Sequence, residues 1–437
     1  MTETMHGGAQ GARELSKSEA RRAVAAAGVG NALEFYDFVT FTFFAIQIGK
    51  TFFPTSSDYV TLMASFATFG AGFFARPIGA WYLGRVSDRT GRKPVLMLSM
   101  VLMGLGTAML VLTPGYATIG IAAPVLAVVA RLIQGFALGG EVGAASSYMI
   151  EASAVHRRGW AISWQQASQQ ISGACGAAVG LVVSLIMSAE KLQSFGWRVA
   201  LGVGLVIVPF ALVIRRSIPE THGDPAKPVL TPPAAASYAR TCVLGCVLIA
   251  SGTIATYAFN YQASYVQSKL HFAPSTALAG QVAGYLVGIF MSLGGGALSD
   301  RVGRRPVIVG SRLLYAAMIV PVLSWQLRSP EPAVTIAAAA LLIIPVAVGA
   351  GAIYAAIAEM LPQQVRATSF ALIYTLPVTF LGGTTQLVLE WLIHVTGNPL
   401  AIGWNLTAVA LVATVAAMFL PESAPARQAA GANLAMA

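Results

Sequence analysis

Long runs of apolar residues, separated by short polar breaks or by Pro and Gly, follow one another along almost the whole chain. Most runs are close to the roughly 20 residues that an α-helix needs to cross the hydrocarbon core of a bilayer. The pattern therefore predicts twelve transmembrane helices. The expected spans are 24–48, 59–83, 94–112, 118–150, 160–187 and 197–215 in the first half, and 240–266, 276–298, 306–327, 333–359, 368–394 and 400–420 in the second.

Composition excludes several classes of protein. Hydrophobic residues make up 56% of the 437 positions and charged residues only 10%, whereas soluble domains carry roughly 25% charged residues. The formal net charge of +10 comes from basic residues spread over short loops, so a nucleic-acid partner is not expected. The chain has no nucleotide loop of the form G-x-x-x-x-G-K-S/T, and its five His and three Cys show no metal-ligand spacing. Neither an enzyme nor a metal or cofactor is therefore predicted.

The basic residues also orient the chain. Loops on the side of the N-terminus hold most of the 27 Lys and Arg residues, so the positive-inside rule places both termini in the cytoplasm. Residues 1–23 lack the apolar and cleavage regions of a signal peptide and are expected to be a cytoplasmic tail. The further divisions are a six-helix bundle at 24–215, a Pro-rich linker at 216–239, a second six-helix bundle at 240–421 and a cytoplasmic tail at 422–437.

The two halves repeat one another. The segment GRVSDRTGRKPV (Gly84–Val95) matches GALSDRVGRRPV (Gly296–Val307) at most positions, and each follows the second span of its half. Two six-helix units in the same order and orientation indicate a parallel duplication, and transporters built in this way bind substrate between the halves.

The repeated loop, written G-x-x-x-D-R-x-G-R-K/R, resembles the cytoplasmic signature of the major facilitator superfamily, and RLIQGFALGGE at 131–141 is similar to its helix-4 motif. The segments GNALEFYDF, FGAGFFARPIGA and SWQQASQQIS resemble the metabolite:H⁺ symporter family within it. IGKTFFP and SDRVGRRPV look most like the citrate and tricarballylate branch of that family. The resemblance implies an all-α membrane protein with the major facilitator fold, in a bacterial inner membrane, and we expect a monomer.

Three polar residues interrupt the first apolar span. Each ionisable group there costs at least about 2.5–3.5 kcal/mol on insertion scales, which makes it a functional candidate. Asn31, Glu34 and Asp37 lie at intervals of three on one part of a helix surface and are expected to face a central cavity together. Two carboxylates this close cannot both be charged cheaply in a low dielectric, which suits a proton carrier. The alternative is an ion pair with an arginine that only holds helices together; for Glu141, pairing and proton transfer are equally open.

Arginines inside the apolar spans are the candidates for binding an anion. Arg131 lies near the middle of the fourth span with Gln134 on the same face, and a guanidinium can bind a carboxylate through two parallel hydrogen bonds. We therefore expect Arg131 to bind substrate, or to pair with an acidic residue until substrate or a proton releases it. Arg76 either completes the substrate site or extends its long side chain so that the charge lies at the membrane surface. Arg312 is expected to extend its side chain to the membrane surface.

Polar stripes on two further spans could line the cavity. One carries Gln165 and Gln169, and the other carries Tyr257 and Asn260. Such residues would form hydrogen bonds with carboxylates and hydroxyls of a substrate. The alternative is that they hold transmembrane helices together, at about 0.6 kcal/mol each.

The resemblance implies that the repeated motifs form a cytoplasmic gate, in which Asp88 and Asp300 meet a helix N-terminus or a basic residue of the other half. Glu151 and Glu359 would pair with basic residues nearby. The remaining predicted gate residues are Arg89, Arg92, Arg158, Arg301, Arg304 and Arg366. The positive-inside rule alone is an adequate alternative for several of these arginines.

Together these features predict a symporter that imports an organic polycarboxylate with H⁺ by alternating access, the substrate being a tricarboxylate such as citrate or tricarballylate. A mono- or dicarboxylate such as 2-oxoglutarate, shikimate or an aromatic acid is the main alternative, because only Arg131 is expected deep in the cavity. From another class, the alternative is a receptor on the same fold that does not transport. Coupling to Na⁺ in place of H⁺ is left open.

Overall fold

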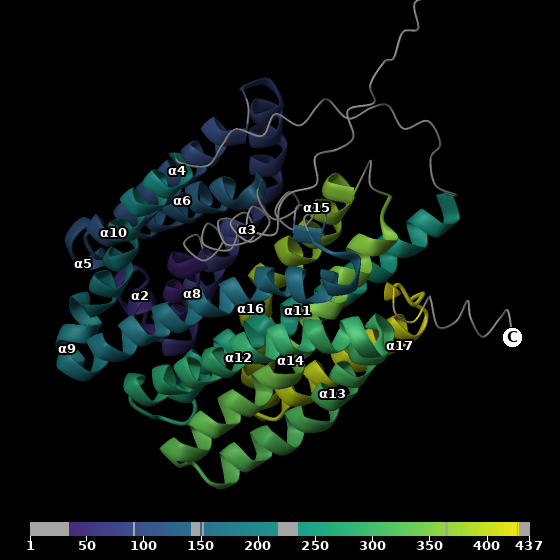
Figure 1. The fold of residues 1–437 in the computed structure, drawn as a ribbon. Helices are drawn as coiled ribbons and strands as arrows, with labels where there is room; N and C mark the ends of the chain where they lie inside the picture. Colours follow the sequence, from purple (N-terminus) through teal and green to yellow (C-terminus); the bar gives the residue numbers. More distant parts are fainter. Residues whose placement is uncertain are drawn as a thin grey trace, which may run out of the picture.

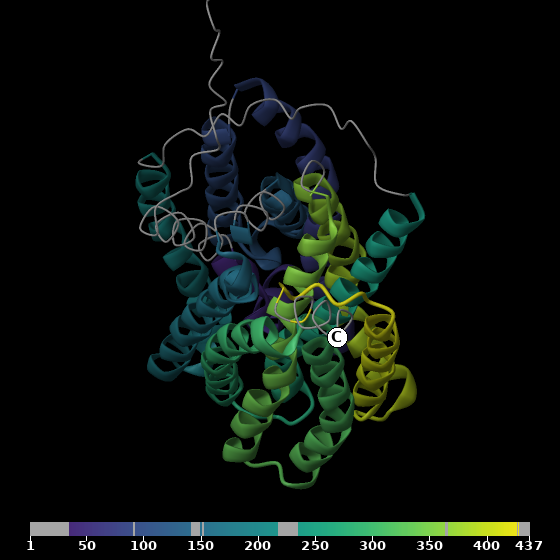
Figure 2. The ribbon, with the colours of Figure 1, turned by 45° about the vertical axis from the view of Figure 1, so that its right-hand side comes forward.

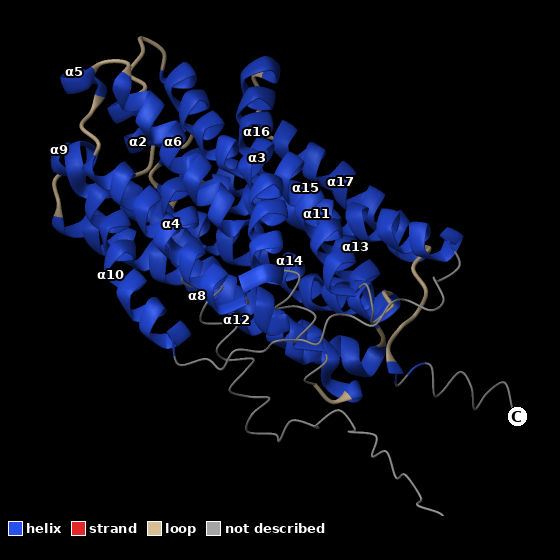
Figure 3. Ribbon diagram, turned by 90° about the horizontal axis from the view of Figure 1, so that it is seen from above, coloured by secondary structure: helices blue, strands red, loops and turns tan. Residues whose placement is uncertain are grey.

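The computed structural model describes residues 35–90, 92–140, 149–150, 153–216, 235–362, 366–425 and 427. Within these residues every regular element is a helix, as Figure 3 shows. Seven of the described helices are long and apolar enough to cross a membrane. Shorter apolar helices cover Met97–Leu112 and Ala122–Ala137. The predicted all-α fold is confirmed.

The helices of the first half follow the expected order. Residues 35–43 are helical, and they are followed by α2 (Ala45–Phe52), α3 (Asp58–Thr90), α4 (Arg92–Leu112), α5 (Tyr116–Ile119), α6 (Ala122–Ala137), the 3₁₀ turns η1 (Leu138–Gly140) and η2 (Val155–Arg157), α8 (Arg158–Ile186), α9 (Ala189–Lys191), the π turn η3 (Leu192–Gly196) and α10 (Trp197–Arg216).

The second half contains α11 (Ala235–Ser268), α12 (Pro274–Val302), α13 (Arg304–Arg328), α14 (Pro332–Met360), α15 (Arg366–Pro377), the π turn η4 (Val378–Gly382), α16 (Gly383–Thr396) and α17 (Ala401–Met418). α11 begins inside the segment 216–239 that the sequence predicts as a linker.

Two predicted spans are interrupted. The helix expected at 24–48 contains a turn at Phe44, after which α2 continues to Phe52. The helix expected to begin at 118 is divided at Gly120, whose φ of 58° lies in the left-handed region and ends α5 before α6 starts. Both breaks fall at points where the apolar pattern alone reads as continuous.

The helices form two groups that meet along a central seam. Figures 1 and 2 show α4, α6 and α10 on one side and α13, α14 and α17 on the other. Between them, α8 of the first half packs along α12 and α14, and α3 packs against α16. Glycine permits the second contact: a Cβ at Gly70 would lie 2.7 Å from the carbonyl oxygen of Gly383.

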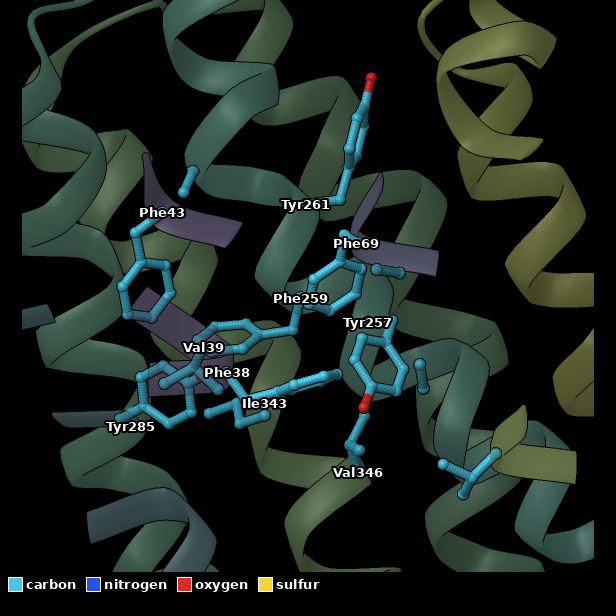
Figure 4. Close-up of a cluster of buried hydrophobic side chains, with 14 of the residues drawn as sticks. Phe38, Val39, Phe43, Phe69, Tyr257, Phe259, Tyr261, Tyr285, Ile343 and Val346 are labelled. Carbon is cyan, nitrogen blue, oxygen red and sulfur yellow. The ribbon is translucent and has the colours of Figure 1, made fainter. Parts of the chain in front are cut away.

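Aromatic side chains from both groups fill the middle of the seam. Figure 4 shows Phe38 and Phe43 of the first half beside Tyr257 and Tyr285 of the second. The Phe38 and Tyr257 ring centroids are 6.3 Å apart, and those of Phe43 and Tyr285 are 6.1 Å apart, both edge to face. These contacts join the halves around a cavity.

Candidate functional site

The main cavity lies between the two halves. Its first-half walls come from the helix at 35–43 and from α8, and most of the remainder comes from α11 to α15. Its polar or hydroxyl-bearing lining residues are Gln166, Gln169, Gln170, Thr253, Thr256, Tyr257, Asn260, Tyr285, Arg312, Tyr354 and Tyr374. The location is the one expected for a transporter with two repeated halves.

Three of the predicted substrate residues line this cavity: Gln169, Tyr257 and Asn260. The Tyr285 hydroxyl donates to Asn260 Oδ1 over 2.5 Å, so α11 and α12 are tied together at the wall. Gln165 is 1% exposed and is not among the lining residues. Gln169, one turn further along α8, reaches the cavity.

The expectation for Arg312 is wrong. Its side chain is 1% exposed and lines the cavity, rather than reaching a membrane surface. The reason is the packing of α13, which lies between α14 and α17 and turns this face of the helix inward. Arg312 Nε and Nη1 have no hydrogen-bond partner among the described residues. The sequence showed only that Arg312 is a charged residue two turns from a helix end. Whether its side chain points to the cavity or to the membrane surface depends on the neighbouring helices.

Asp37 does not face this cavity, contrary to the expectation for the first span. It is 4% exposed and contacts Thr107 of α4 through its Oδ2 atom. Its Oδ1 atom has no partner among the described residues and points toward α10, where a Cβ on Gly204 would lie 1.8 Å away. Phe35, Phe38 and Val39 of the same helix line the cavity instead. The helix thus has one face on the cavity and one inside the first bundle.

A chain of hydrogen bonds connects Asp37 to Arg131. Gln134 Nε2 donates to Thr107 Oγ1 over 2.9 Å, and Arg131 Nη1 donates to Gln134 Oε1 over 2.7 Å. Arg131 and Gln134 are each 1% exposed, and neither lines the cavity. The two residues expected to bind substrate are therefore placed behind the cavity wall, in a network with the buried carboxylate.

Phenylalanine rings contact the guanidinium groups of Arg76 and Arg131. The Arg131 Cζ atom lies 3.8 Å from the Phe41 ring centroid, and the Arg76 Cζ atom lies 4.3 Å from that of Phe73 and 4.9 Å from that of Phe38. Arg76 is 6% exposed and is not among the lining residues. Arg76 therefore neither extends to the membrane surface nor lines the cavity directly.

Asp300 joins the two halves at one end of the molecule. Its carboxylate accepts hydrogen bonds from the backbone N–H groups of Gly159 and Trp160, both at 2.9 Å, at the start of α8. Arg304, fully buried, pairs with Asp300 at 2.7 Å and with Glu359 at 2.9 Å. The family resemblance implies that Asp300 meets a helix N-terminus or a basic residue of the other half, and the contact seen here is with a helix N-terminus.

The other predicted residues are placed less fully. Asn31, Glu34, Glu141 and Glu151 lie outside the described residues. The backbone of Asp88, Arg89 and Arg92 is helical, but the structure does not describe their side chains. Arg158 and Arg366 are half-buried, and Arg301 is exposed.

A second buried acidic group was not singled out in the sequence. Glu390 of α16 is 1% exposed; it accepts a hydrogen bond from Tyr261 at 2.5 Å and pairs with Lys269 at 2.8 Å. Tyr261 lies on α11 and Lys269 directly follows the last residue of that helix, and both are more than a hundred residues from Glu390. Only the packing of α11 against α16 brings them together.

The fold and the cavity define a polytopic helical membrane protein built to bind a ligand between two halves. The profile of the Major Facilitator Superfamily matches residues 27–376, and the chain belongs to this superfamily. It is therefore a multi-pass membrane transporter and not an enzyme. The likeness extends to solved structures: the partially occluded, inward-open xylose transporter XylE from E. coli gives a TM-score of 0.74 at 16% identity, covering 93% of this chain and 99% of that one.

Curated relatives are similar along most of the chain. A citrate-proton symporter of Salmonella typhi is 35% identical over 90% of this chain and 92% of its own length. The alpha-ketoglutarate permease of Escherichia coli K12 is 32% identical over 93% and 96%. A proline/betaine transporter of Salmonella typhimurium is 28% identical over 94% and 85%.

Proposed function

We propose that this protein is a proton-coupled importer of an organic polycarboxylate, with a tricarboxylate such as citrate or tricarballylate as substrate. The names of the two relatives at 34–35% identity, both citrate-proton symporters, support this substrate. The cavity between the halves, whose lining includes Arg312 and several amide and hydroxyl side chains, supports binding of a small organic ion at the point around which the halves would move.

Asp37 carries the proposal of proton coupling. A carboxylate that is 4% exposed and has one oxygen unpaired among the described residues is costly to keep charged inside a membrane protein. Uptake of a proton removes that cost, and release restores it. The residue is therefore suited to carry one proton in each transport cycle.

The hydroxyl of Thr107 provides a means of sensing that proton. It lies within hydrogen-bonding distance of Asp37 Oδ2 and, at 3.0 Å, of the Met103 carbonyl oxygen, but it has a single hydrogen to donate. With Asp37 charged, the hydrogen is directed to the carboxylate. With Asp37 protonated, Asp37 donates to Thr107 and the Thr107 hydrogen turns to Met103. Gln134, which donates to the same oxygen, transmits the change to Arg131.

Alternating access would use the contact at Asp300. We place this end in the cytoplasm, following the positive-inside rule, and the protein in a bacterial inner membrane as a monomer. While Asp300 holds the N-terminus of α8, the cytoplasmic side is closed and substrate and proton enter from the other side. Breaking that contact would open the cavity inward, where the lower proton concentration favours release from Asp37.

The test is uptake of labelled citrate, tricarballylate and 2-oxoglutarate into proteoliposomes, with and without an inward proton gradient. We expect the gradient to increase uptake of the tricarboxylates in the wild type, and Asp37→Asn to abolish the increase while preserving exchange of external for internal substrate. Equal uptake with and without the gradient would contradict proton coupling. A preference for 2-oxoglutarate would move the substrate to the dicarboxylates, and binding without any transport would indicate a receptor.

A further inference from the structure

We infer that Arg312 of α13 binds a carboxylate group of the transported anion directly. The inference rests on the proposed function, because it names the residue that would select an anionic substrate in the same cavity. It moves the cationic anchor from Arg131, in the first half, to the second half of the molecule.

The burial of Arg312 requires a compensating partner. Its side chain is 1% exposed, and the Nε and Nη1 atoms are unpaired among the described residues. The ion pairs described for the chain join Lys50 to Asp58, Lys269 to Glu390, and Arg304 to Asp300 and Glu359, so none of them includes Arg312. A guanidinium removed from water without a counter-charge costs several kcal/mol, and an anion in the cavity would offset that cost.

The rest of the lining complements an anion as well. Four buried polar atoms of the lining residues have no hydrogen-bond partner among the described residues, and all four are donors. They are Arg312 Nε, Arg312 Nη1, Gln169 Nε2 and Gln170 Nε2. No carboxylate lines the cavity among the described residues. A ligand rich in acceptor oxygens and carrying negative charge satisfies this set, whereas a cationic or donor-rich ligand leaves it unpaired.

The position of these donors also suggests how binding is linked to movement. Gln169 and Gln170 lie on α8 in the first half, and Arg312 lies on α13 in the second. An anion with two or more carboxylates can take the bidentate contact of the guanidinium with one group and the amides of α8 with another. Such a ligand holds the halves together, so it stabilises the state in which they enclose it.

A zwitterion such as glycine betaine is the competing ligand, because the aromatic residues of the lining could hold its ammonium group. Its single carboxylate would neutralise Arg312, but nothing would then pair with the α8 amides. The comparison of ligands with one, two and three carboxylates therefore tests the chemistry of the site as well as the role of the arginine.

The experiment measures binding of citrate, tricarballylate, 2-oxoglutarate and glycine betaine to the purified full chain in nanodiscs by calorimetry. The variants are Arg312→Gln, Arg312→Lys and, as a matched control, Arg328→Gln, which changes an exposed arginine on the same helix. We expect Arg312→Gln to weaken binding of the acids by on the order of tenfold to a hundredfold, as loss of charge-assisted hydrogen bonds predicts. Arg312→Lys should lie between, because it keeps the charge but not the paired geometry, and Arg328→Gln should bind as the wild type does.

Melting temperatures of the same samples show whether each variant is folded. If Arg312→Gln does not fold, the binding test uses Arg312→Lys. Unchanged affinity for the acids in a folded Arg312 variant would overturn the inference, as would wild-type binding of glycine betaine but of no acid. The assay uses no proton gradient. If uptake proves independent of the proton gradient, the binding result for Arg312 still stands. If Arg312 proves unimportant for binding, the gradient-driven uptake experiment still tests proton coupling.

Discussion

Thr107 and Asp37 share a hydrogen bond between α4 and the first helix, and the Thr107 hydroxyl is at the same time 3.0 Å from the carbonyl oxygen of Met103. Two acceptors therefore compete for one hydrogen. The protonation state of Asp37 decides between them, because only a protonated Asp37 can donate to Thr107 itself. We propose that this pair converts protonation of Asp37 into a rotation of the Thr107 hydroxyl, whose oxygen accepts a hydrogen bond from Gln134.

Thr107→Val should uncouple transport from the proton gradient. Valine has the shape of threonine but no hydroxyl, so the connection from Asp37 to Gln134 is lost while the packing is kept. Loss of a hydrogen bond to a charged group is worth about 1.5–3 kcal/mol, so we expect gradient-driven accumulation to fall roughly tenfold or more. Exchange of labelled for unlabelled substrate, which needs no net proton movement, should persist.

Thr107→Ser is the control for that variant, since serine retains the hydroxyl and should retain most of the accumulation. If Thr107→Val accumulates substrate as well as Thr107→Ser does, the hydroxyl has no part in coupling.

Gly204→Ala should displace the Asp37 carboxylate. A Cβ at Gly204 would lie 1.8 Å from Asp37 Oδ1, so the side chain must rotate away and leave Thr107. The clash is with the end of a movable side chain and not with backbone, so we expect the protein to fold with little change in melting temperature. Gradient-driven uptake should fall as in Asp37→Asn.

Gly202→Ala provides a matched control on the same helix, because a Cβ there meets no atom within 4 Å. Both substitutions carry the same gain in helix propensity, about 1 kcal/mol. Equal uptake by the two variants would mean that the position of the Asp37 carboxylate is not critical.

The hydrophobic pattern predicts the helices well because each crosses a membrane largely by itself. Their packing is a different matter. The spacing of Asn31, Glu34 and Asp37 shows that they share a face, but it does not show that for Asp37 this face meets α4 and α10 rather than the cavity. Arg312 was misplaced for the same reason, since only the positions of α14 and α17 turn its face inward.

Contacts between distant segments were predictable only where a repeated motif marked them. The resemblance of the duplicated loop to a family signature implied that Asp300 meets the other half, and the backbone N–H groups of Gly159 and Trp160 are its partners there. Glu390 had no such signal. Its partners are Tyr261 in α11 and Lys269 directly after that helix, and nothing in the local sequence connects them to Glu390.

Gly296→Ala should prevent closure at the end that carries Asp300. A Cβ at Gly296 would lie 1.9 Å from Ser163 Oγ and 2.5 Å from the carbonyl oxygen of Gly159, so α8 and α12 could not approach as they do here. We expect the population with this end closed to fall and uptake to be lost. Distances between spin labels at Val155 in the first half and Val302 in the second, both exposed, measure the change.

The labels require replacement of Cys175, Cys242 and Cys246. Gly294→Ala is the control, since a Cβ at this position of α12 meets nothing within 4 Å. A distance distribution for Gly296→Ala that coincides with that of Gly294→Ala would show that the close approach is not needed for closure.

Glu390 should prove structural, although it is as deeply buried as Asp37. Both of its carboxylate oxygens are occupied, Oε2 by the Tyr261 hydroxyl and Oε1 by Lys269 Nζ, whereas Asp37 keeps one oxygen unpaired among the described residues. Removing one member of a buried pair leaves the other charge uncompensated, at a cost of roughly 3–5 kcal/mol when both are fully buried. Lys269 is 27% exposed, so Glu390→Gln should cost less than that.

The double variant Glu390→Gln/Lys269→Met separates a structural role from proton coupling. Removing both charges eliminates the uncompensated one, so melting temperature should recover much of what Glu390→Gln alone loses. Gradient-driven uptake should recover with it if Asp37 carries the proton, as we propose. If the double variant is stable but shows no response to the proton gradient, Glu390 takes part in coupling, and the assignment of the proton to Asp37 alone must be abandoned.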